Sequence, residues 1–228
     1  MQTTQYMQIK RKEKIENINV DCNGATLQLS NLRCACWQEE KMLILSDMHL
    51  GKTAHFRQHG IQIPSSVMQS DLQRLSTAIA TYNADKLLVV GDMFHKDYNA
   101  DIKLFSEWKD AFKHIKILLV KGNHDKLDDV HYSQLGIEVF KNNYTLNNLF
   151  FTHDFCTNTG FTISGHLHPG VLIRGKADQT IKLPCFVKTS QQLILPAFSK
   201  FTGLDIHSFN STADTEYFAF TDSSIFKL

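Results

Sequence analysis

The stretch Leu87–Asp92, which reads Leu-Leu-Val-Val-Gly-Asp, decides the fold class of this 228-residue chain. Four consecutive apolar residues are typical of a buried strand. Gly91 lets the backbone turn tightly after that strand, and Asp92 then stands at its carboxyl end. In an α/β sheet the chemistry collects at the carboxyl ends of the strands. This stretch therefore predicts an α/β fold with a functional carboxylate at Asp92.

Four other apolar runs end in polar clusters of the same kind. They are Leu43–Leu45 before Asp47-Met48-His49, Ile117–Val120 before Gly122-Asn123-His124-Asp125, Leu149–Phe151 before Thr152-His153-Asp154, and Phe161–Ile163 before Gly165-His166-Leu167-His168. Five adjacent strands that end in Asp, His and Asn would bring these side chains to one place. Such a collection predicts a metal site, and one with two metals.

The rest of the sequence predicts one domain over residues 1–228 with two packed sheets. Apolar residues recur at three- and four-residue steps in Ser66–Tyr82 and again at about 101–114, which predicts two helices. After residue 135 short strand-like segments dominate, including 206–209. We expect a parallel first half, an antiparallel second half and helices outside the sheets. The segment 1–14 is expected to be flexible.

The composition excludes few functions but indicates the environment of the protein. Lys+Arg number 24 and Asp+Glu 23, for a net charge of +1, so any affinity for nucleic acid must be local. No apolar run approaches the length of a membrane span, and no membrane partner is expected. The five cysteines show no regular framework, which favours a reducing cytoplasm. Cys34 and Cys36 are too close for the usual zinc pairing and are interpreted as small strand residues.

The polar clusters offer a varied set of ligand atoms. In an extended strand, Asp47 and His49 would face the same way and reach one ion. Asp92 has two carboxylate oxygens and is our candidate bridge between two cations. Asn123 offers a neutral oxygen, and His153 a further imidazole.

The remaining histidines divide into ligands and a proton donor. His166 and His168 give two more imidazoles. His124 would point away from the ligands, which leaves it free for acid–base work, and Asp125 could hold its ring. Imidazole, carboxylate and amide ligands without thiolates favour Mn, Fe, Zn or Mg-like ions over structural zinc.

The ordered series of clusters resembles the calcineurin-like metallophosphoesterase superfamily. Its pattern is Asp-x-His, Gly-Asp, Gly-Asn-His-Asp, a single His and Gly-His-x-His. The resemblance implies a four-layer αββα sandwich, that is, two mixed sheets flanked by helices, around a dinuclear centre. It assigns Asp47, His49, Asp92 and His168 to the first metal, and Asp92, Asn123, His153 and His166 to the second.

The same resemblance implies a mechanism. A hydroxide shared by the two ions would attack phosphorus, and His124 would protonate the leaving oxygen as the catalytic histidine.

A narrower resemblance, to the ligase-associated DNA damage response endonuclease group PdeM, covers nearly the whole chain. It rests on Asp47–Lys52 (DMHLGK) with Phe56-Arg57, Gly60–Pro64 (GIQIP), Asp71–Leu75 (DLQRL), Gly91–His95 (GDMFH), Gly165–Pro169 (GHLHP), Leu183–Phe186 (LPCF), Leu195–Phe198 (LPAF) and Phe201–Gly203 (FTG). Asp154-Phe155 replaces an expected Glu-Pro, and Ser199 an expected Gly. The resemblance implies two divalent ions, most simply Mn²⁺, a nucleic-acid substrate, and repair partners comprising an ATP-dependent DNA ligase, a helicase and an exonuclease.

Basic and aromatic side chains near the clusters are candidate substrate contacts. Arg57 suits a bidentate phosphate contact, and Lys52 and His95 lie close to the ligands in sequence. A solvated loop is the alternative interpretation for Lys52 and Arg57, and a residue behind the ligands for His95. The basic residues Lys10-Arg11-Lys12 and Lys14 could touch a nucleic-acid backbone or belong to a solvated tail. Phe198 and Phe201 could stack on a base, although core packing is the commoner use.

Three functions remain open from the sequence. The first is a metal-dependent phosphodiesterase or phosphatase that acts on nucleic acid in DNA repair. The second is a small-molecule phosphoesterase for nucleotides or lipid-linked pyrophosphates. The third is a non-catalytic metal-binding scaffold in a repair complex, against which the complete ligand set and His124 argue.

Overall fold

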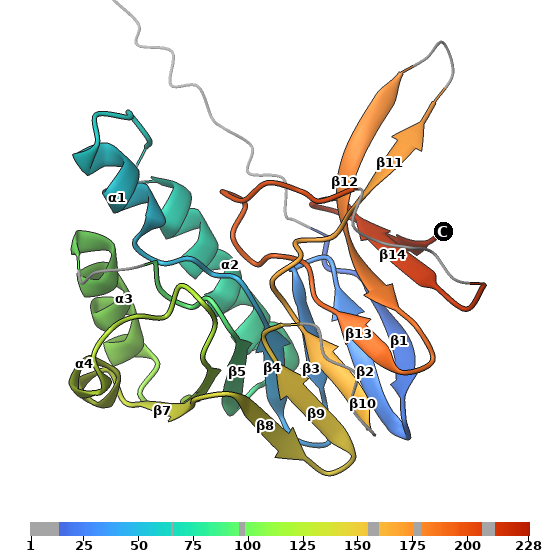
Figure 1. The fold of residues 1–228 in the computed structure, drawn as a ribbon, viewed down its shortest axis with the longest axis horizontal. Helices are drawn as coiled ribbons and strands as arrows, with labels where there is room; N and C mark the ends of the chain where they lie inside the picture. Colours follow the sequence, from blue (N-terminus) through green and yellow to red (C-terminus); the bar gives the residue numbers. More distant parts are fainter. Residues whose placement is uncertain (1–13, 65, 96–98, 155–159, 176–178, 207–212) are drawn as a thin grey trace, which may run out of the picture.

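Two mixed β-sheets face each other in the computed structural model, which describes residues 14–64, 66–95, 99–154, 160–175, 179–206 and 213–228 (Figure 1). The first sheet runs in chain order: β1 (Asn17–Cys22), β2 (Ala25–Ser30), β3 (Cys34–Trp37), β4 (Met42–Leu45), β5 (Lys86–Val90), β6 (Lys116–Val120) and β7 (Ile137–Phe140). Strands β1 to β4 pair antiparallel, and β4 to β7 pair parallel.

The second sheet has the order β15-β14-β12-β13-β10-β9-β8, with β11 paired to β12. Its strands are β8 (Asn143–Leu146), β9 (Leu149–Thr152), β10 (Phe161–Ser164), β11 (Gly170–Arg174), β12 (Thr180–Lys188), β13 (Gln192–Ile194), β14 (Glu216–Phe220) and β15 (Ile225–Lys227). Strands β9, β10 and β13 are parallel and the other pairs antiparallel. The expected division into a parallel and an antiparallel half is thus wrong, because each sheet is mixed.

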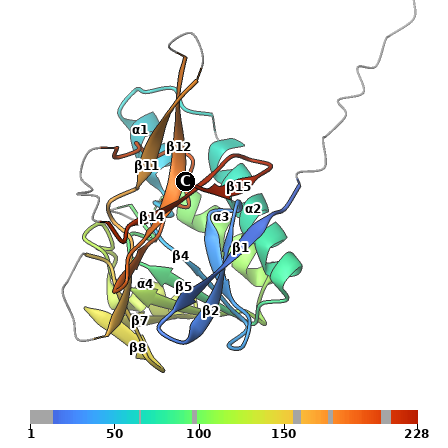
Figure 2. The same cartoon turned by 90° about the vertical axis from the view of Figure 1, so that its right-hand side faces the viewer.

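Helices cover the first sheet on the side away from the second (Figures 1 and 2). They are α1 (Lys52–Gln58), α2 (Ser66–Tyr82), α3 (Ala100–Ala111) and α4 (Asp129–Gln134). The sequence predicted α2 and α3 from their apolar periodicity. It missed α1 and α4, which have only 7 and 6 residues and too few turns to show a period.

Strand β5 is buried on both faces. Leu87 and Val89 pack into the core between the helices and the first sheet, and Leu88 and Val90 into the core between the two sheets. All four side chains are 0% exposed. At about 1.5–3 kcal/mol for each buried aliphatic side chain, this burial is a main source of stability for the first sheet. The predicted class, two packed mixed sheets with helices, is confirmed.

Some predictions fall outside the described residues. These are the expectation for residues 1–14, of which only residue 14 is described, the basic run Lys10–Lys12, and most of the expected strand at 206–209. Cys34 and Cys36 lie in β3, are buried and form no disulfide, as the strand interpretation required. None of the helices within the described ranges is both long and apolar enough to cross a membrane.

Candidate metal centre

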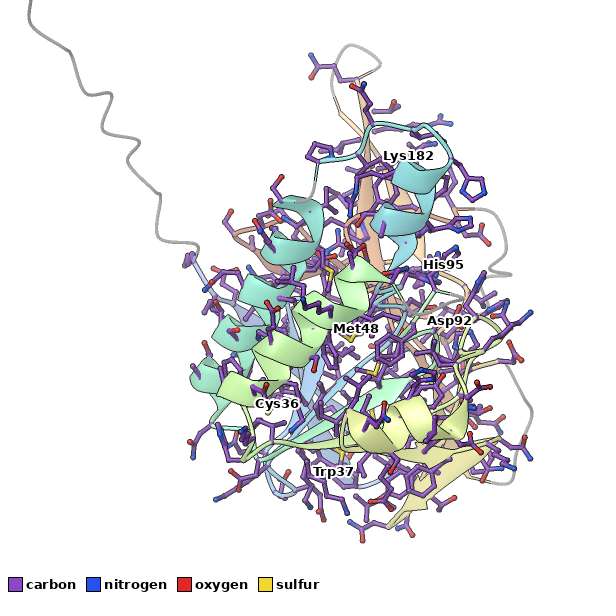
Figure 3. All side chains as sticks on the ribbon, turned by 90° about the vertical axis from the view of Figure 1, so that its left-hand side faces the viewer. Cys36, Trp37, Met48, Asp92, His95 and Lys182 are labelled. Carbon is purple, nitrogen blue, oxygen red and sulfur yellow. The ribbon has the colours of Figure 1, made fainter. Side chains whose placement is uncertain are left out.

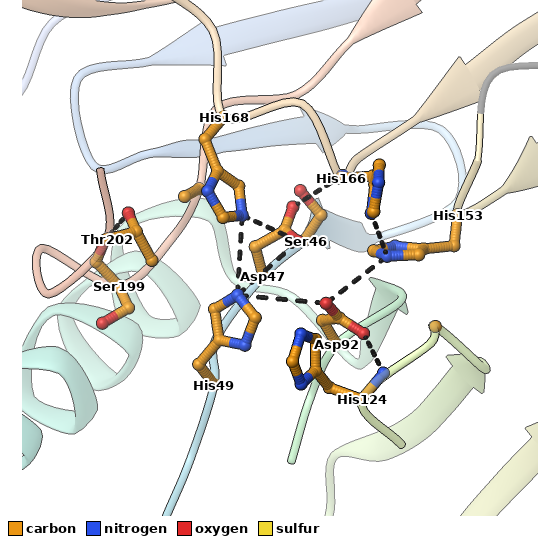
Figure 4. Close-up of polar contacts among 12 residues, drawn as sticks. Ser46, Asp47, His49, Asp92, His124, His153, His166, His168, Ser199 and Thr202 are labelled. Carbon is orange, nitrogen blue, oxygen red and sulfur yellow. Dashed lines mark hydrogen bonds and ion pairs between the residues drawn. The ribbon is translucent and has the colours of Figure 1, made fainter. Parts of the chain in front are cut away.

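The polar clusters meet at one edge of the sandwich, but their strands are divided between the two sheets. Strands β4, β5 and β6 of the first sheet supply three clusters, and β9 and β10 of the second supply two. The expectation of five adjacent strands is therefore wrong. Two parallel groups of strands present their carboxyl ends to the same space, which has the same effect on the side chains (Figure 4).

Backbone hydrogen bonds fix the loops that carry the ligands. The Asp47 amide donates to the Gly91 carbonyl over 3.0 Å, and the His49 amide to the Asp92 carbonyl over 2.9 Å. The loops after β4 and β5 thus continue the parallel pairing of their strands.

Five ligand candidates have left-handed backbone conformations. The φ angles are 54° at Asp47, 48° at His49, 52° at Asp92, 70° at His166 and 48° at His168. The extended-strand geometry expected for Asp47 and His49 is wrong, since both have positive φ, but the two side chains still lie in one ligand group. Positive φ is uncommon outside glycine, and such strain concentrates at functional sites.

The first ligand group consists of Asp47, His49 and His168. One ligand atom from each lies within 4.8 Å of the others. His168 Nε2 is 3.2 Å from Asp47 Oδ1 and 3.5 Å from His49 Nε2. Asp47 and His49 are buried, and His168 is half-buried.

The second group consists of Asp92, His153 and His166, with the same 4.8 Å limit. His153 Nε2 is 3.4 Å from Asp92 Oδ2 and 3.1 Å from His166 Nδ1. Asp92 Oδ2 is also 3.9 Å from His49 Nε2 of the first group. Asp92 therefore lies between the groups, in the position that a bridging carboxylate requires.

Asn123 joins the second group. Its Oδ1 atom is 3.2 Å from His153 Nε2, and its side chain is exposed. All seven metal-ligand candidates named from the sequence are thus found together.

Two glycines make room for these ligands. A Cβ atom on Gly91 would lie 1.9 Å from His153 Nδ1, and a Cβ atom on Gly122 would lie 2.2 Å from Asp92 Oδ1. Gly91 also has a φ of 85°, which confirms the tight turn that the sequence predicted. Any side chain at either position would displace a ligand.

Burial and carboxylates set the protonation of the ligands. Burial lowers the pKa of His49 to about 3, because it outweighs the attraction of Asp47 and Asp92. Burial also disfavours a charged His153, but Asp92 and Asp47 overcome it and raise the His153 pKa to about 9. Burial would raise the pKa of Asp92, but His153 opposes this and holds it at about 2. The carboxylates therefore stay ionised and favour positive charge beside them.

The donor set fits divalent metal ions. Asp47 Oδ1 is buried and accepts no hydrogen bond of good geometry within the described residues. Two pairs of imidazole nitrogens approach within 3.5 Å and 3.1 Å, a convergence that a shared cation explains. Imidazole, carboxylate and amide oxygen without thiolate suit Mn, Fe or Zn.

His124 lies beside both groups. Its amide donates to Asp92 Oδ1 over 2.9 Å, and its ring meets the His49 ring edge-on with centroids 5.3 Å apart. The ring also stacks on that of His95 at 5.0 Å.

Asp125 serves a different purpose from the one expected. Its carboxylate accepts hydrogen bonds from the backbone amides of Phe94 at 2.8 Å, Gly122 at 2.9 Å and Met93 at 3.3 Å. Among the described residues no hydrogen bond links it to the His124 ring. Asp125 therefore ties the loop after β6 to the loop after β5 rather than orienting His124.

The three residues expected to contact the substrate have different surroundings in the structure. Lys52 is half-buried, its Nζ lies 5.9 Å from the centroid of the Phe201 ring, and the charges of Asp47 and Asp92 oppose the lowering of its pKa by burial. Arg57 instead forms a salt bridge to Asp101 at 2.9 Å, which fixes α1 to α3. His95 is 8% exposed and lies behind His124.

The sequence reasoning missed a support for the first ligand group. The amides of Phe198 and Ser199 donate to the carbonyls of Ser46 and Asp47 at 2.9 and 3.2 Å. Arg74, only 7% exposed, holds Phe198 in turn by donating to its carbonyl. Phe198 is fully buried, so it packs the core and cannot stack on a base. The arginine in the middle of a helix pattern was the only signal.

The fold and the site together define a sandwich with a two-group histidine and aspartate metal centre at the strand ends. A family model for calcineurin-like phosphoesterases matches residues 40–201, which include every ligand candidate. No curated protein matches the chain. Among solved structures, the Pseudomonas putida nuclease MPE has the same fold, with a TM-score of 0.79 and 24% sequence identity over 93% of this chain and 100% of that chain.

The chain belongs to the calcineurin-like phosphoesterase family. It is therefore a metal-dependent phosphoesterase, and the two histidine and aspartate groups are its candidate metal-binding sites.

Proposed function

We propose that this phosphoesterase hydrolyses phosphodiester bonds in nucleic acid, at ends or in single strands, during DNA repair. The observation that carries the proposal is Asp92, which lies between two ligand groups with His124 beside them. The named activity of the structural neighbour, a nuclease, supports the choice of substrate. The resemblance to repair endonucleases supports the setting, a cytoplasm that also holds a ligase, a helicase and an exonuclease.

The seven ligands would hold two ions, most simply Mn²⁺. Asp47, His49 and His168 would hold one and Asn123, His153 and His166 the other, with Asp92 shared. The chemistry that two such cations supply is activation of water and neutralisation of charge on the phosphate oxygens.

His124 would act as the general acid. Its backbone is anchored on Asp92, its ring is half-buried, and the ring lies among imidazoles rather than against a carboxylate. A ring in this position can carry a proton to a leaving alkoxide, which typically contributes about 10²–10⁴-fold to the rate. Asp125 would contribute by holding the loop that presents His124.

Lys52 would orient the phosphate. It is the first residue of α1, three residues after His49, and burial lowers its pKa while the charges of Asp47 and Asp92 oppose that shift. Arg57, already bound to Asp101, would support α1 instead of binding phosphate.

The reaction class is tested with the metal-free protein and bis-p-nitrophenyl phosphate. Added Mn²⁺ should restore release of p-nitrophenol, and a protein that binds Mn²⁺ without hydrolysis would be a scaffold instead. Labelled single-stranded, duplex and 3′-phosphorylated oligonucleotides, with cyclic nucleotides beside them, then test the substrate class. Hydrolysis of the cyclic nucleotides alone would favour the small-molecule alternative.

The role of His124 is tested by leaving-group dependence. His124→Ala should lose about 10²–10⁴-fold in kcat on an oligonucleotide, whose alkoxide needs a proton, and much less on a p-nitrophenyl ester, whose leaving group does not. Metal content should stay unchanged. An equal loss on both substrates would contradict the assignment.

A further inference from the structure

The β11–β12 hairpin carries a basic face that the proposed reaction leaves unused. Strand β11 begins at Gly170, two residues after the ligand His168, and pairs only with β12 over residues 180–184. The hairpin and α1 project at the same end of the molecule, as Figures 1 and 2 both show. Helix α1 begins three residues after His49, as the hairpin begins two residues after His168. Both elements therefore start close in sequence to a ligand candidate.

The strand register shows which side chains share a face of the hairpin. Phe186 packs between the two sheets. Lys182 lies four residues before it and so continues the same face. Leu172 is the partner of Lys182, and Arg174 follows two residues later. All three are exposed, and Figure 3 shows Lys182 at the end of the molecule beyond His95 and Asp92.

The opposite face of the hairpin is already used. Val171, Ile173 and Leu183 pack with Cys185 and Val187 on the outer side of the second sheet. The face formed by Leu172, Arg174 and Lys182, which we call the hairpin face, has no such partner among the described residues.

Charge indicates the occupant of this face. Neither Arg174 nor Lys182 forms an ion pair or hydrogen bond with the described residues. The described part of the hairpin, 170–175 and 179–188, contains no acidic residue, and its third basic residue, Lys188, is paired with Glu216 at 3.5 Å. Two unpaired cations around an exposed leucine suit phosphates with a base between them. A second copy of the chain fits poorly, because a symmetric contact would bring like charges together.

We propose that the hairpin face binds the single-stranded nucleic acid that extends from the metal centre, with Arg174 and Lys182 on phosphates and Leu172 against a base. This inference rests on the proposed nucleic-acid substrate. Leu172 and Arg174 lie four and six residues from His168, so they are at most about 14 Å and 21 Å away along the chain. Stacked nucleotides rise about 3.4 Å each, so the contacts lie within about six nucleotides of the reacting phosphate.

The reach of the hairpin predicts a dependence on substrate length. Arg174→Gln with Lys182→Gln should raise the KM for a 20-nucleotide single strand about tenfold and leave kcat unchanged. The slope of log affinity against log salt should fall by about 1.4, since each phosphate contact on a single strand contributes about 0.7. Hydrolysis of bis-p-nitrophenyl phosphate and of a dinucleotide should not change, because neither reaches the hairpin.

A matched variant controls for charge alone. Lys41→Gln with Lys113→Gln removes two exposed lysines next to the amino ends of β4 and β6, away from the ligands. This variant should bind the oligonucleotide like the wild type.

The possible results separate the two proposals. A wild type that hydrolyses bis-p-nitrophenyl phosphate but neither binds nor cleaves oligonucleotides overturns the proposed function, and the hairpin inference with it. A wild type that cleaves oligonucleotides, with the hairpin variant equal to it in KM and salt slope, overturns the hairpin inference alone. A dimer that the hairpin variant dissociates, without a change in oligonucleotide binding, overturns it as well.

Discussion

The two ligand groups share the carboxylate of Asp92 but differ in how they are enclosed. Each group has two buried members, but the third member of the Asp47 group, His168, is half-buried, and the segment through Phe198 and Ser199 fastens that group's backbone to the second sheet. The group of His153 and His166 opens to solvent, since His166 and Asn123 are exposed. From this difference in exposure we expect the Asp47 group to hold an ion more tightly and the other group to be more open to substrate.

The shared carboxylate should matter most, because its loss affects both groups. Asp92→Asn should lower kcat/KM on bis-p-nitrophenyl phosphate about 10³-fold, since an amide offers one oxygen and no charge. Steady-state kinetics in saturating Mn²⁺ measure this.

Asp154→Asn is the matched control for Asp92. Asp154 is exposed, 3.7 Å from His166 Nδ1, and belongs to the rim of the open group. It should change kcat/KM by no more than about threefold. An equal loss of kcat/KM in the two variants would contradict the role of Asp92 as the carboxylate that both groups share.

The enclosed and open groups should differ in the cost of losing a histidine. His49→Ala removes a buried imidazole that lies 3.9 Å from both Asp47 and Asp92, and we expect Mn²⁺ affinity to fall about 100-fold. His166→Ala removes a ligand that water can replace, and about tenfold is expected. Calorimetric titration of both metal-free variants compares them, and a larger loss from His166→Ala would reverse the roles of the groups.

The support of the enclosed group can be weakened without touching a ligand. Arg74→Met leaves Asp71, its 2.6 Å partner, buried and unpaired, and should cost about 3 kcal/mol of unfolding free energy. Lys227→Met breaks an exposed pair with Glu216 and should cost less than about 1 kcal/mol. Denaturant titrations of both proteins measure the free energy of unfolding. Similar losses in the two variants would contradict the supporting role of Arg74.

Much of the fold and of the candidate site could be predicted from the sequence, because buried strands appear as continuous apolar runs. The apolar run Leu87–Val90 and the residue Asp92 after it predicted both a strand and its functional end. The same reasoning identified the other ligand candidates, which the structure brings together, and helix α2 at its observed bounds.

The remainder depends on contacts between distant parts of the chain, which no local pattern contains. The division of strands between two sheets follows from packing of both faces. Arg57 pairs with Asp101, and Asp125 accepts hydrogen bonds from three backbone amides. These groups come together only through the fold. The left-handed backbone at His49 and His168 is fixed by the loops around it, so the residue spacing of an extended strand did not predict it.

The central claim is that two ligand groups hold two metal ions with Asp92 between them. The most direct test is the metal content of the wild-type protein after reconstitution with Mn²⁺ and removal of free ion, measured by mass spectrometry beside protein concentration, together with the electron paramagnetic resonance spectrum. The account predicts two ions per chain, with exchange coupling from a shared ligand. One ion per chain, or two without coupling, would contradict it.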